Sequence, residues 1–198
     1  MNTQFQYQIS EYDCVPITFI NAIVQLFDRK EVPPIVLQHI YLYSLDTVTR
    51  GNRLGRAGTS KFAVQLLGNW LASYRTKNFS VATKFLRQDT IHMKPKSRII
   101  RALQTDGVAL CNIHLGRGEW HFILALEIKG NRVLFFDPYY RTSVRGLRGV
   151  VEVLAENGKP RSPNLAIDID WFDRTDERSR FCMGPVDMRE CLLMWKNR

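Results

Sequence analysis

The sequence predicts an α+β domain in which N-terminal helices pack on a mainly antiparallel sheet. Apolar residues recur at helical spacing through the first half of the chain, from residue 15 to residue 104. Three β-prone apolar runs then follow one another up to residue 136, separated by short turns. Because the helices come first and the strands later, instead of alternating, the pattern favours an antiparallel sheet over a parallel one.

Length and composition are those of a single-domain globular protein. The 198 residues are 45% hydrophobic and 24% charged, so we expect one domain over residues 1–198. The first thirteen residues lack the basic and apolar regions of a signal peptide. No apolar run approaches the roughly 20 residues that a membrane span needs. These features predict a soluble, cytoplasmic protein with no membrane span.

Charge and cysteine usage narrow the expected partners. The net charge is +9, but it is spread along the chain without long basic runs interleaved with aromatic residues. Nucleic acid is therefore an unfavoured partner, and an acidic peptide segment is a better one. The cysteines show neither a CxxC motif nor regular disulfide spacing, so we expect reduced thiols, no metal and no cofactor. They are Cys14, Cys111, Cys182 and Cys191.

The first predicted helix begins beside a cysteine. Residues 15–27 are apolar except for three polar residues spaced three and four apart, which fall on one narrow stripe. A helix of this kind is surrounded by the rest of its domain. Pro16 suits the first helical turn, and Asp13 is a candidate N-cap. We therefore expect a central helix with Cys14 at its N-terminus.

The position of Cys14 suggests a reactive thiol. Backbone N–H groups and the positive end of the helix dipole favour an anion there, and hence the thiolate. A buried structural thiol is the alternative reading, because free cysteines are among the most buried residue types. The choice between the two depends on which groups the rest of the chain brings near Cys14.

The next patterns predict three more helices and a short strand. Each helical pattern repeats apolar residues at intervals of three and four. Thr59 or Ser60 is a plausible N-cap for the second of these helices, and Asp106-Gly107 is a strong turn signal after the third. The expected helices span residues 35–43, 62–74 and 97–104, and the expected strand spans residues 79–85.

The centre of the predicted sheet is a β-hairpin. Gly130-Asn131 supplies a tight turn between the second and third β-prone runs. His121 lies at the start of the second run and Asp137 just past the end of the third, so antiparallel pairing brings the two residues side by side. The three runs span residues 108–113, 120–128 and 132–136.

A histidine oriented by a carboxylate can act as a general base for a nucleophile at its other nitrogen. Cys14 would be that nucleophile, His121 the base and Asp137 the orienting group. His114 is a rival base, because it precedes a glycine-containing turn that leads back toward His121. We prefer His121, since Asp137 has no comparable relation to His114. Taken singly, His121 could be a hydrogen-bonded structural histidine and Asp137 an Asp-Pro turn former.

Three motifs follow one another along the chain: Gln8 followed by Asp13-Cys14 and Pro16, then residues 120–124, then residues 133–138. In this order they resemble the C39 family of papain-like cysteine peptidases. The resemblance covers roughly residues 6–140 and implies a papain-like fold with a central nucleophile helix. It implies Cys14 as nucleophile, His121 as base, Asp137 as orienting group and Gln8 as an oxyanion-hole donor.

The activity implied is that of a thiol hydrolase that cleaves a peptide or amide bond through a thioester. The substrate would be a peptide or protein, possibly an acidic one. Two alternatives use the same fold: transfer of the acyl group to an amine, and peptide binding without catalysis. The family usually has glycine directly after the cysteine, whereas this chain has Val15, whose branched side chain we expect to narrow or reshape the substrate groove.

Two loops rich in arginine and glycine, residues 49–60 and 141–149, are either solvated connections or contacts for an acidic substrate. The C-terminal third predicts short strands and structural roles for Cys182 and Cys191. The expected strands lie within residues 150–154, 165–172 and 191–195, with a turn at residues 156–160.

Overall fold

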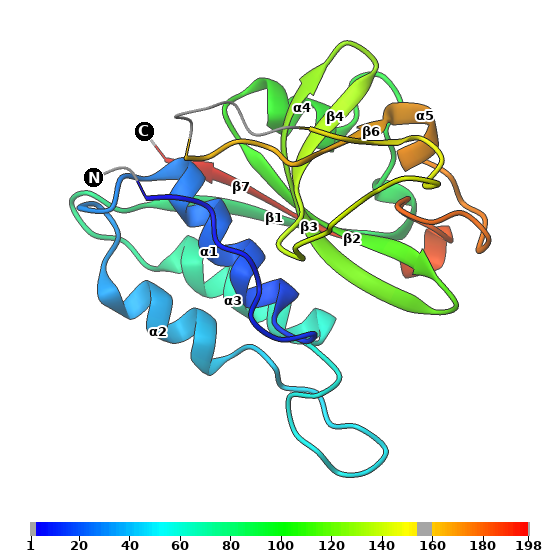
Figure 1. Cartoon of the computed structure of the whole chain (residues 1–198). Coiled ribbons are helices and arrows are strands. Elements are labelled where there is room, and N and C mark those ends of the chain that lie inside the picture. The colour runs from blue at the N-terminus through cyan, green and yellow to red at the C-terminus, as the bar shows by residue number, and fades with distance from the viewer. Residues whose placement is uncertain (1–2, 154–159, 198) are drawn as a thin grey trace.

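The computed structural model describes residues 3–153 and 160–197 of the chain (Figure 1). It contains one seven-stranded sheet with the strand order β1-β7-β2-β3-β4-β6-β5, and every neighbouring pair is antiparallel. Helices α1 to α3 lie on one side of the sheet, and α4 and α5 lie on the other. The predicted α+β class with an antiparallel sheet is confirmed.

The elements follow the predicted order along the chain. The helices are α1 (Cys14–Leu26), α2 (Pro34–Leu42), α3 (Lys61–Ser73), α4 (Arg98–Gln104) and α5 (Ile169–Phe172). The strands are β1 (Val81–Arg87), β2 (Val108–Gly116), β3 (Glu119–Lys129), β4 (Arg132–Phe136), β5 (Val150–Glu152), β6 (Leu165–Asp168) and β7 (Glu190–Lys196). Two 3₁₀ turns are η1 (Gln88–Thr90) and η2 (Val186–Met188).

Two hydrophobic cores lie on the two faces of the sheet. Consecutive strand residues face opposite sides, so Phe135 and Phe136 of β4 enter different cores. Phe136 packs with α1, α2 and α3, whereas Phe135 packs with α4 and α5. Burying a side chain of this size stabilises the fold by about 1.5–3 kcal/mol. The sheet is therefore the central layer, and each group of helices buries its apolar side chains against one of its faces.

Helix α1 is central, as its nearly continuous apolar surface predicts. Every residue from Val15 to Val24 is buried. Two of its polar residues are satisfied inside the protein: Thr18 Oγ1 donates to the Cys14 carbonyl at 2.7 Å, and Asn21 exchanges hydrogen bonds with the backbone of Gln6. The second interaction ties the N-terminal segment to α1.

Local side-chain chemistry fixes two of the helix starts. Ser60 accepts a hydrogen bond from the Ala63 N–H at the start of α3, and Ser97 accepts one from Ile100 at the start of α4. Asp13 occupies the N-cap position of α1 but makes no side-chain cap. Its carboxylate instead accepts from the preceding Ile9 and Ser10 N–H groups, so the predicted capping bond is replaced by a tight turn before the helix.

The C-terminal third differs from the sequence expectation at one strand. Residues 165–172 form strand β6 only as far as Asp168 and then a helical turn, α5. The predicted last strand is present as β7, which docks between β1 and β2. The predicted strand at 150–154 is present as β5, and its residue 154 lies outside the described part, as do residues 156–159 of the predicted turn at 156–160. Within the described residues, no helix combines the length and apolar character needed to cross a membrane.

Candidate active site

The β3–β4 hairpin brings His121 and Asp137 into direct contact. Leu124 pairs with Phe136 and Lys129 with Arg132 around the turn at Gly130, so the start of β3 returns beside the end of β4. The His121 Nε2 atom lies 2.6 Å from Asp137 Oδ1. Both side chains are buried. The predicted proximity of the two residues is therefore present, while their catalytic roles stay predictions.

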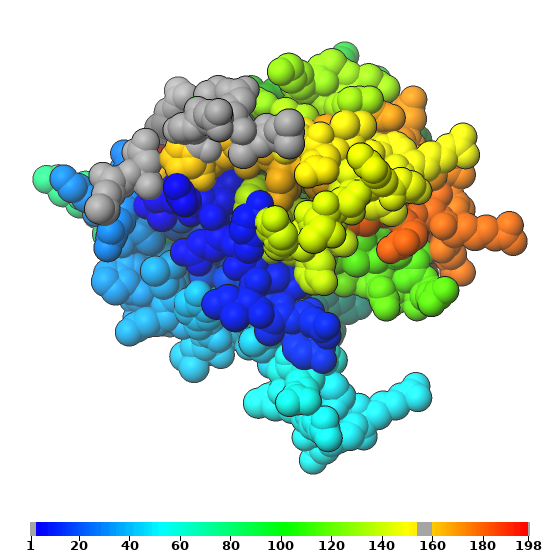
Figure 2. All heavy atoms as spheres, viewed as in Figure 1, coloured from blue at the N-terminus to red at the C-terminus, as the bar shows by residue number. Residues whose placement is uncertain are grey.

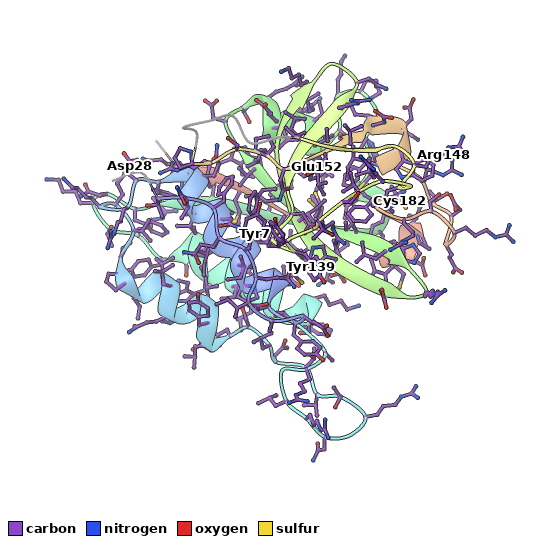
Figure 3. The ribbon with its side chains drawn as sticks, viewed as in Figure 1. Tyr7, Asp28, Tyr139, Arg148, Glu152 and Cys182 are labelled. Carbon is purple, nitrogen blue, oxygen red and sulfur yellow. The ribbon has the colours of Figure 1, made fainter. Side chains whose placement is uncertain are left out.

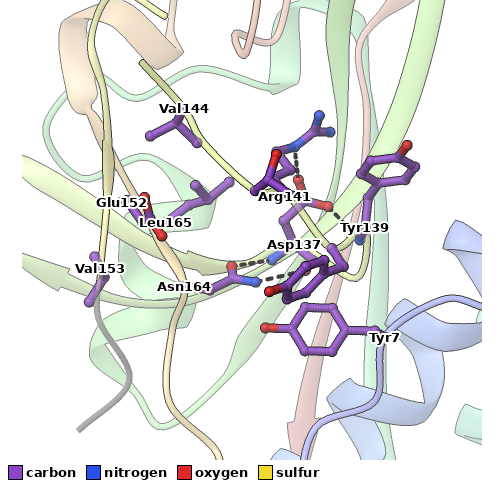
Figure 4. Close-up of a pocket in the computed structure, with 11 residues that line it drawn as sticks. Tyr7, Asp137, Tyr139, Arg141, Val144, Glu152, Val153, Asn164 and Leu165 are labelled. Carbon is purple, nitrogen blue, oxygen red and sulfur yellow. Dashed lines mark hydrogen bonds and ion pairs between the residues drawn. The ribbon is translucent and has the colours of Figure 1, made fainter.

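The Asp137 carboxylate is held by more groups than the sequence indicated. The Tyr139 N–H donates to Oδ1 at 2.9 Å, and the Arg141 Nε–H donates to Oδ2 at 2.7 Å. The Asn164 side chain clamps the Asp137 backbone, because it accepts from the N–H at 2.7 Å and donates to the carbonyl at 2.9 Å. Figure 4 shows these contacts converging on Asp137. Neither Arg141 nor Asn164 was singled out as a partner of Asp137 from the sequence.

Cys14 approaches His121 from the helix layer that covers this face of the sheet. It is the first residue of α1, and the helix is fastened to β3 where Thr18 Oγ1 also donates to the Phe122 carbonyl at 3.2 Å. The Cys14 side chain lies near enough to His121 to help raise the pKa of the ring, through a hydrogen bond and through its charge. Since Nε2 of that ring faces Asp137, Nδ1 is the nitrogen left for the thiol. The site thus runs from cysteine through histidine to aspartate.

Charge in the site favours protonated His121. Burial is the largest influence and disfavours the cation, but the hydrogen bonds and negative charges of Asp137 and Cys14 outweigh it and raise the pKa of His121 to about 9. Burial likewise acts to raise the pKa of Asp137, yet its bond to His121 and the charges of His121 and Arg141 lower the pKa below its ordinary value. At neutral pH the pair is an imidazolium beside a carboxylate.

The rival base has a different environment. His114 is buried, and its Nδ1 atom lies 3.0 Å from the Ser179 carbonyl. Its backbone pairs with Cys182, and its ring centroid lies 5.2 Å from that of Trp120. This histidine ties the segment that carries Ser179 and Cys182 to strand β2.

A backbone hydrogen bond holds Gln8 next to the residue that follows Asp137. The Gln8 N–H donates to the Pro138 carbonyl at 2.8 Å, directly after Asp137. The side-chain amide donates one hydrogen bond to the Ser10 carbonyl at 2.8 Å. An amide nitrogen carries two N–H groups, and this bond uses one of them. The fixed amide keeps a second donor, so the oxyanion-hole role of Gln8 stays a prediction.

The Val15 side chain is buried, and its expected effect on a substrate groove stays a prediction. It is only 1% exposed and packs in the core beneath the sheet face that carries α1. The residue after Cys14 points inward, because successive residues of a helix are about 100° apart around its axis.

The other cysteines lie in different surroundings from Cys14. Among the four cysteines, all of which lie in the described residues, Cys14 alone is not buried. The Cys111 and Cys191 sulfur atoms are 3.8 Å apart across β2 and β7. Burial raises the pKa of the Cys182 thiol and of the Cys191 thiol. These environments fit the structural roles expected for Cys182 and Cys191.

A cavity of about 210 Å³ adjoins Asp137. Tyr7 and Tyr139 contribute to its wall from the N-terminal segment and from the loop after β4 (Figures 3 and 4). The basic loop at residues 49–60 instead projects from the body of the protein (Figure 2). Its proposed contact with substrate stays a prediction.

Comparisons with known proteins give a weak structural likeness. No protein-family model and no curated protein sequence matches the chain. A similar solved structure is the crystal structure of a double glycine motif protease from an AMS/PCAT transporter in complex with the leader peptide. The two chains are 14% identical, the match covers 100% of this chain and 96% of that chain, and the TM-score is 0.43. A likeness at this level assigns no activity, so the functional argument has to rest on the geometry around Cys14.

Proposed function

We propose that this chain is a C39-like cysteine peptidase with a papain-like fold, forming a single domain over residues 1–198. It cleaves a peptide or amide bond of a peptide or protein substrate. The observation that carries the proposal is His121, which lies between the Cys14 thiol and the Asp137 carboxylate with its Nε2 2.6 Å from Asp137. A nucleophile, a base and an orienting group in this order are what thiol acyl chemistry requires.

The proposed reaction begins with the Cys14 thiolate and protonated His121. The sulfur attacks the carbonyl carbon of the substrate, and the carbonyl oxygen becomes an oxyanion. As the carbon–nitrogen bond breaks, His121 gives its Nδ1 proton to the departing amine, which leaves a thioester on Cys14. Neutral His121 then removes a proton from water, and the resulting hydroxide displaces the thiolate and releases the acid.

Asp137 keeps the ring in the orientation that this sequence needs. A carboxylate on Nε2 holds a proton there, so Nδ1 is the nitrogen that exchanges its proton with sulfur, amine and water. The oxyanion would be stabilised by the Cys14 backbone N–H and by the second N–H of Gln8. At the first residue of a helix, that backbone N–H has no intrahelical partner.

Gln8→Ala is expected to lower kcat by about 10²–10³, because one donor to the oxyanion is lost. The binding of substrate in its ground state should change much less. Steady-state kinetics at pH 7 would measure both quantities. Gln4→Ala is the matched control, since Gln4 is an exposed glutamine of the same segment. A kcat of Gln8→Ala within twofold of the unmodified chain would remove Gln8 from the mechanism.

Selective alkylation tests the proposed nucleophile. Iodoacetamide at pH 7 should modify Cys14 roughly ten times faster than Cys111, Cys182 or Cys191, because Cys14 is the proposed nucleophile and the other three thiols are buried. Peptide mapping by mass spectrometry after short exposures gives the four rates. His121→Gln should slow the modification of Cys14 and leave the other rates unchanged. Equal modification of all four thiols would count against the proposal.

The products of a reaction decide between hydrolysis and the two alternatives. A peptide library incubated with the chain should yield fragments with free carboxyl ends. Fragments joined to an added amine would identify acyl transfer instead. A peptide that binds equally to the unmodified chain and to Cys14→Ser but is not cleaved by either would identify a binding module.

A further inference from the structure

Arg141 is bound to Asp137 on the side away from His121. It lies in the loop after β4, and its Nε atom donates to Asp137 Oδ2 at 2.7 Å. The guanidinium stands 4.8 Å from the Tyr139 ring centroid and 4.7 Å from that of Phe181. Its side chain is 21% exposed, and that of Asp137 is 1% exposed. A guanidinium packed between two rings and bonded to a buried carboxylate is held in one orientation.

The contact fixes how the carboxylate can turn. His121 Nε2 and the Tyr139 N–H use Oδ1, while Arg141 uses Oδ2. If the carboxylate rotated about its Cβ–Cγ bond, at least one of these donors would lose its acceptor inside the protein. Leaving a buried donor without a partner destabilises the protein. Arg141 therefore acts on the angle at which Asp137 meets His121.

The contact also balances charge. A Cys14 thiolate, a His121 imidazolium and an Asp137 carboxylate together carry one net negative charge. An unpaired charge is costly to bury, and Asp137 is the most deeply buried of the three. The Arg141 cation brings the sum to zero and completes an alternating row of minus, plus, minus, plus.

We propose that Arg141 is a positioning residue of this site, which holds Asp137 ionised and turned toward His121 and completes a row of four alternating charges that begins at Cys14. This inference rests on the proposed function for the meaning of the site. Arg141 touches neither the nucleophile nor the scissile bond in this assignment. It acts through Asp137, and its effect should be visible in the protonation of His121.

The direction of that effect follows from the groups that face His121. These are Cys14 from α1, and Asp137 and Tyr139 from the end of β4, the Tyr139 ring standing edge-on at 6.5 Å. His114 on the neighbouring strand β2 is turned to the Ser179 carbonyl. Arg141 is the cation on the far side of Asp137. Its removal takes away a positive charge near the imidazolium and should therefore raise the pKa of His121.

The experiment is an NMR titration of the His121 ring in the full chain, with the signal assigned by its loss in His121→Gln. The unmodified chain should show a midpoint near pH 9, the value to which the pKa of His121 is raised. Arg141→Met should move the midpoint upward by about one unit, a usual effect of one nearby charge. Arg145→Met is the matched control, because Arg145 is an exposed arginine of the same loop, and its midpoint should not move.

Arg141→Lys separates charge from geometry and keeps a cation in the site if the methionine variant does not fold. Lysine should hold the midpoint within a few tenths of a unit but lower kcat about tenfold, because an ammonium lacks the planar fork that fixes the carboxylate. The inference would be overturned if the His121 titration midpoint were the same in Arg141→Met and in the unmodified chain. It would also be overturned if Arg141→Lys kept the kcat of the unmodified chain. The titration needs no substrate. A shifted midpoint in a chain that cleaves nothing would therefore refute the peptidase and not Arg141.

Discussion

Cys14→Ala should lose cleavage almost completely, with a fall in kcat on the order of 10⁶, as when the nucleophile of a catalytic triad is removed. Each step of the proposed reaction passes through the Cys14 sulfur, and the other three cysteines are buried. The loss should not come from unfolding, because Cys14 is half-buried and its side chain contributes only to the edge of the core. Cleavage of a library-derived peptide under single-turnover conditions would measure the effect.

The matched control for this substitution is Cys111→Ala. It removes a thiol of the same size from a buried site between β2 and β7, so it should lower the unfolding temperature and leave the kcat of the folded protein within about twofold. Thermal unfolding of both variants distinguishes a loss of catalysis from a loss of stability. If Cys14→Ala retained a tenth of the original kcat, Cys14 could not be the nucleophile.

The parts of the site that were predictable from the sequence depend on local patterns. A nearly all-apolar helix preceded by a cysteine fixes where Cys14 lies, since such a helix has to occupy the centre of the domain. The hairpin places His121 opposite Asp137 because a tight turn determines the register of the two strands it joins. The contact between these two units joins residues more than 100 positions apart, and no local pattern encodes it.

Other features depend on tertiary partners. Residues 165–172 alternate like a strand, but β6 ends at Asp168 because its partner β4 begins at Arg132, the residue paired with Asp168. Beyond that point the chain has no ladder to join and turns into α5. The Asp13 carboxylate could likewise accept hydrogen bonds either from the first N–H groups of α1 or from the residues before it. It accepts from the Ile9 and Ser10 N–H groups. The sequence alone does not tell which of these hydrogen-bonding partners is used in the folded chain.

The Asp137–Arg141 pair shows why a basic loop is hard to interpret from sequence. Arg141, Arg145 and Arg148 are equivalent as a pattern, which is compatible with a solvated loop and with a contact for an acidic segment. In the fold, Arg141 turns inward to a carboxylate four residues earlier, and Arg148 packs against Trp171. Arg145 is exposed. One loop thus provides a positioning group, a packing group and a solvated cation.

Asp137→Asn is the second substitution with a large expected effect, and kcat should fall by about 10⁴. An amide is close to the carboxylate in shape, but it has one acceptor oxygen and one NH₂ donor. If the oxygen faces His121, the NH₂ meets the Arg141 Nε–H, and if the amide turns round, it meets the His121 ring. Either way one donor loses its acceptor, and the ring is no longer held with its proton on Nε2. Asp187→Asn, at an exposed aspartate in η2, is the control and should leave kcat unchanged.

The same substitution should lower the free energy of unfolding by about 3 kcal/mol near pH 6, since it breaks a buried ion pair on one side. The pH dependence has a definite sign. Asp137 has a lowered pKa, so its contribution is present above its ordinary value of 3.8 and is lost as the pH falls through the lowered value. His121 has a raised pKa, so its contribution is complete below 6.5 and is lost as the pH rises through about 9.

The difference in unfolding free energy between the unmodified chain and Asp137→Asn should therefore be largest between about pH 4 and pH 6.5 and shrink on either side. Urea unfolding at a series of pH values measures it. A difference that stays flat from pH 4 to pH 10 would mean that Asp137 stabilises the fold only as a hydrogen-bonding group. In that case the imidazolium, on which proton delivery to the leaving amine depends, would not be the state that the folded site selects.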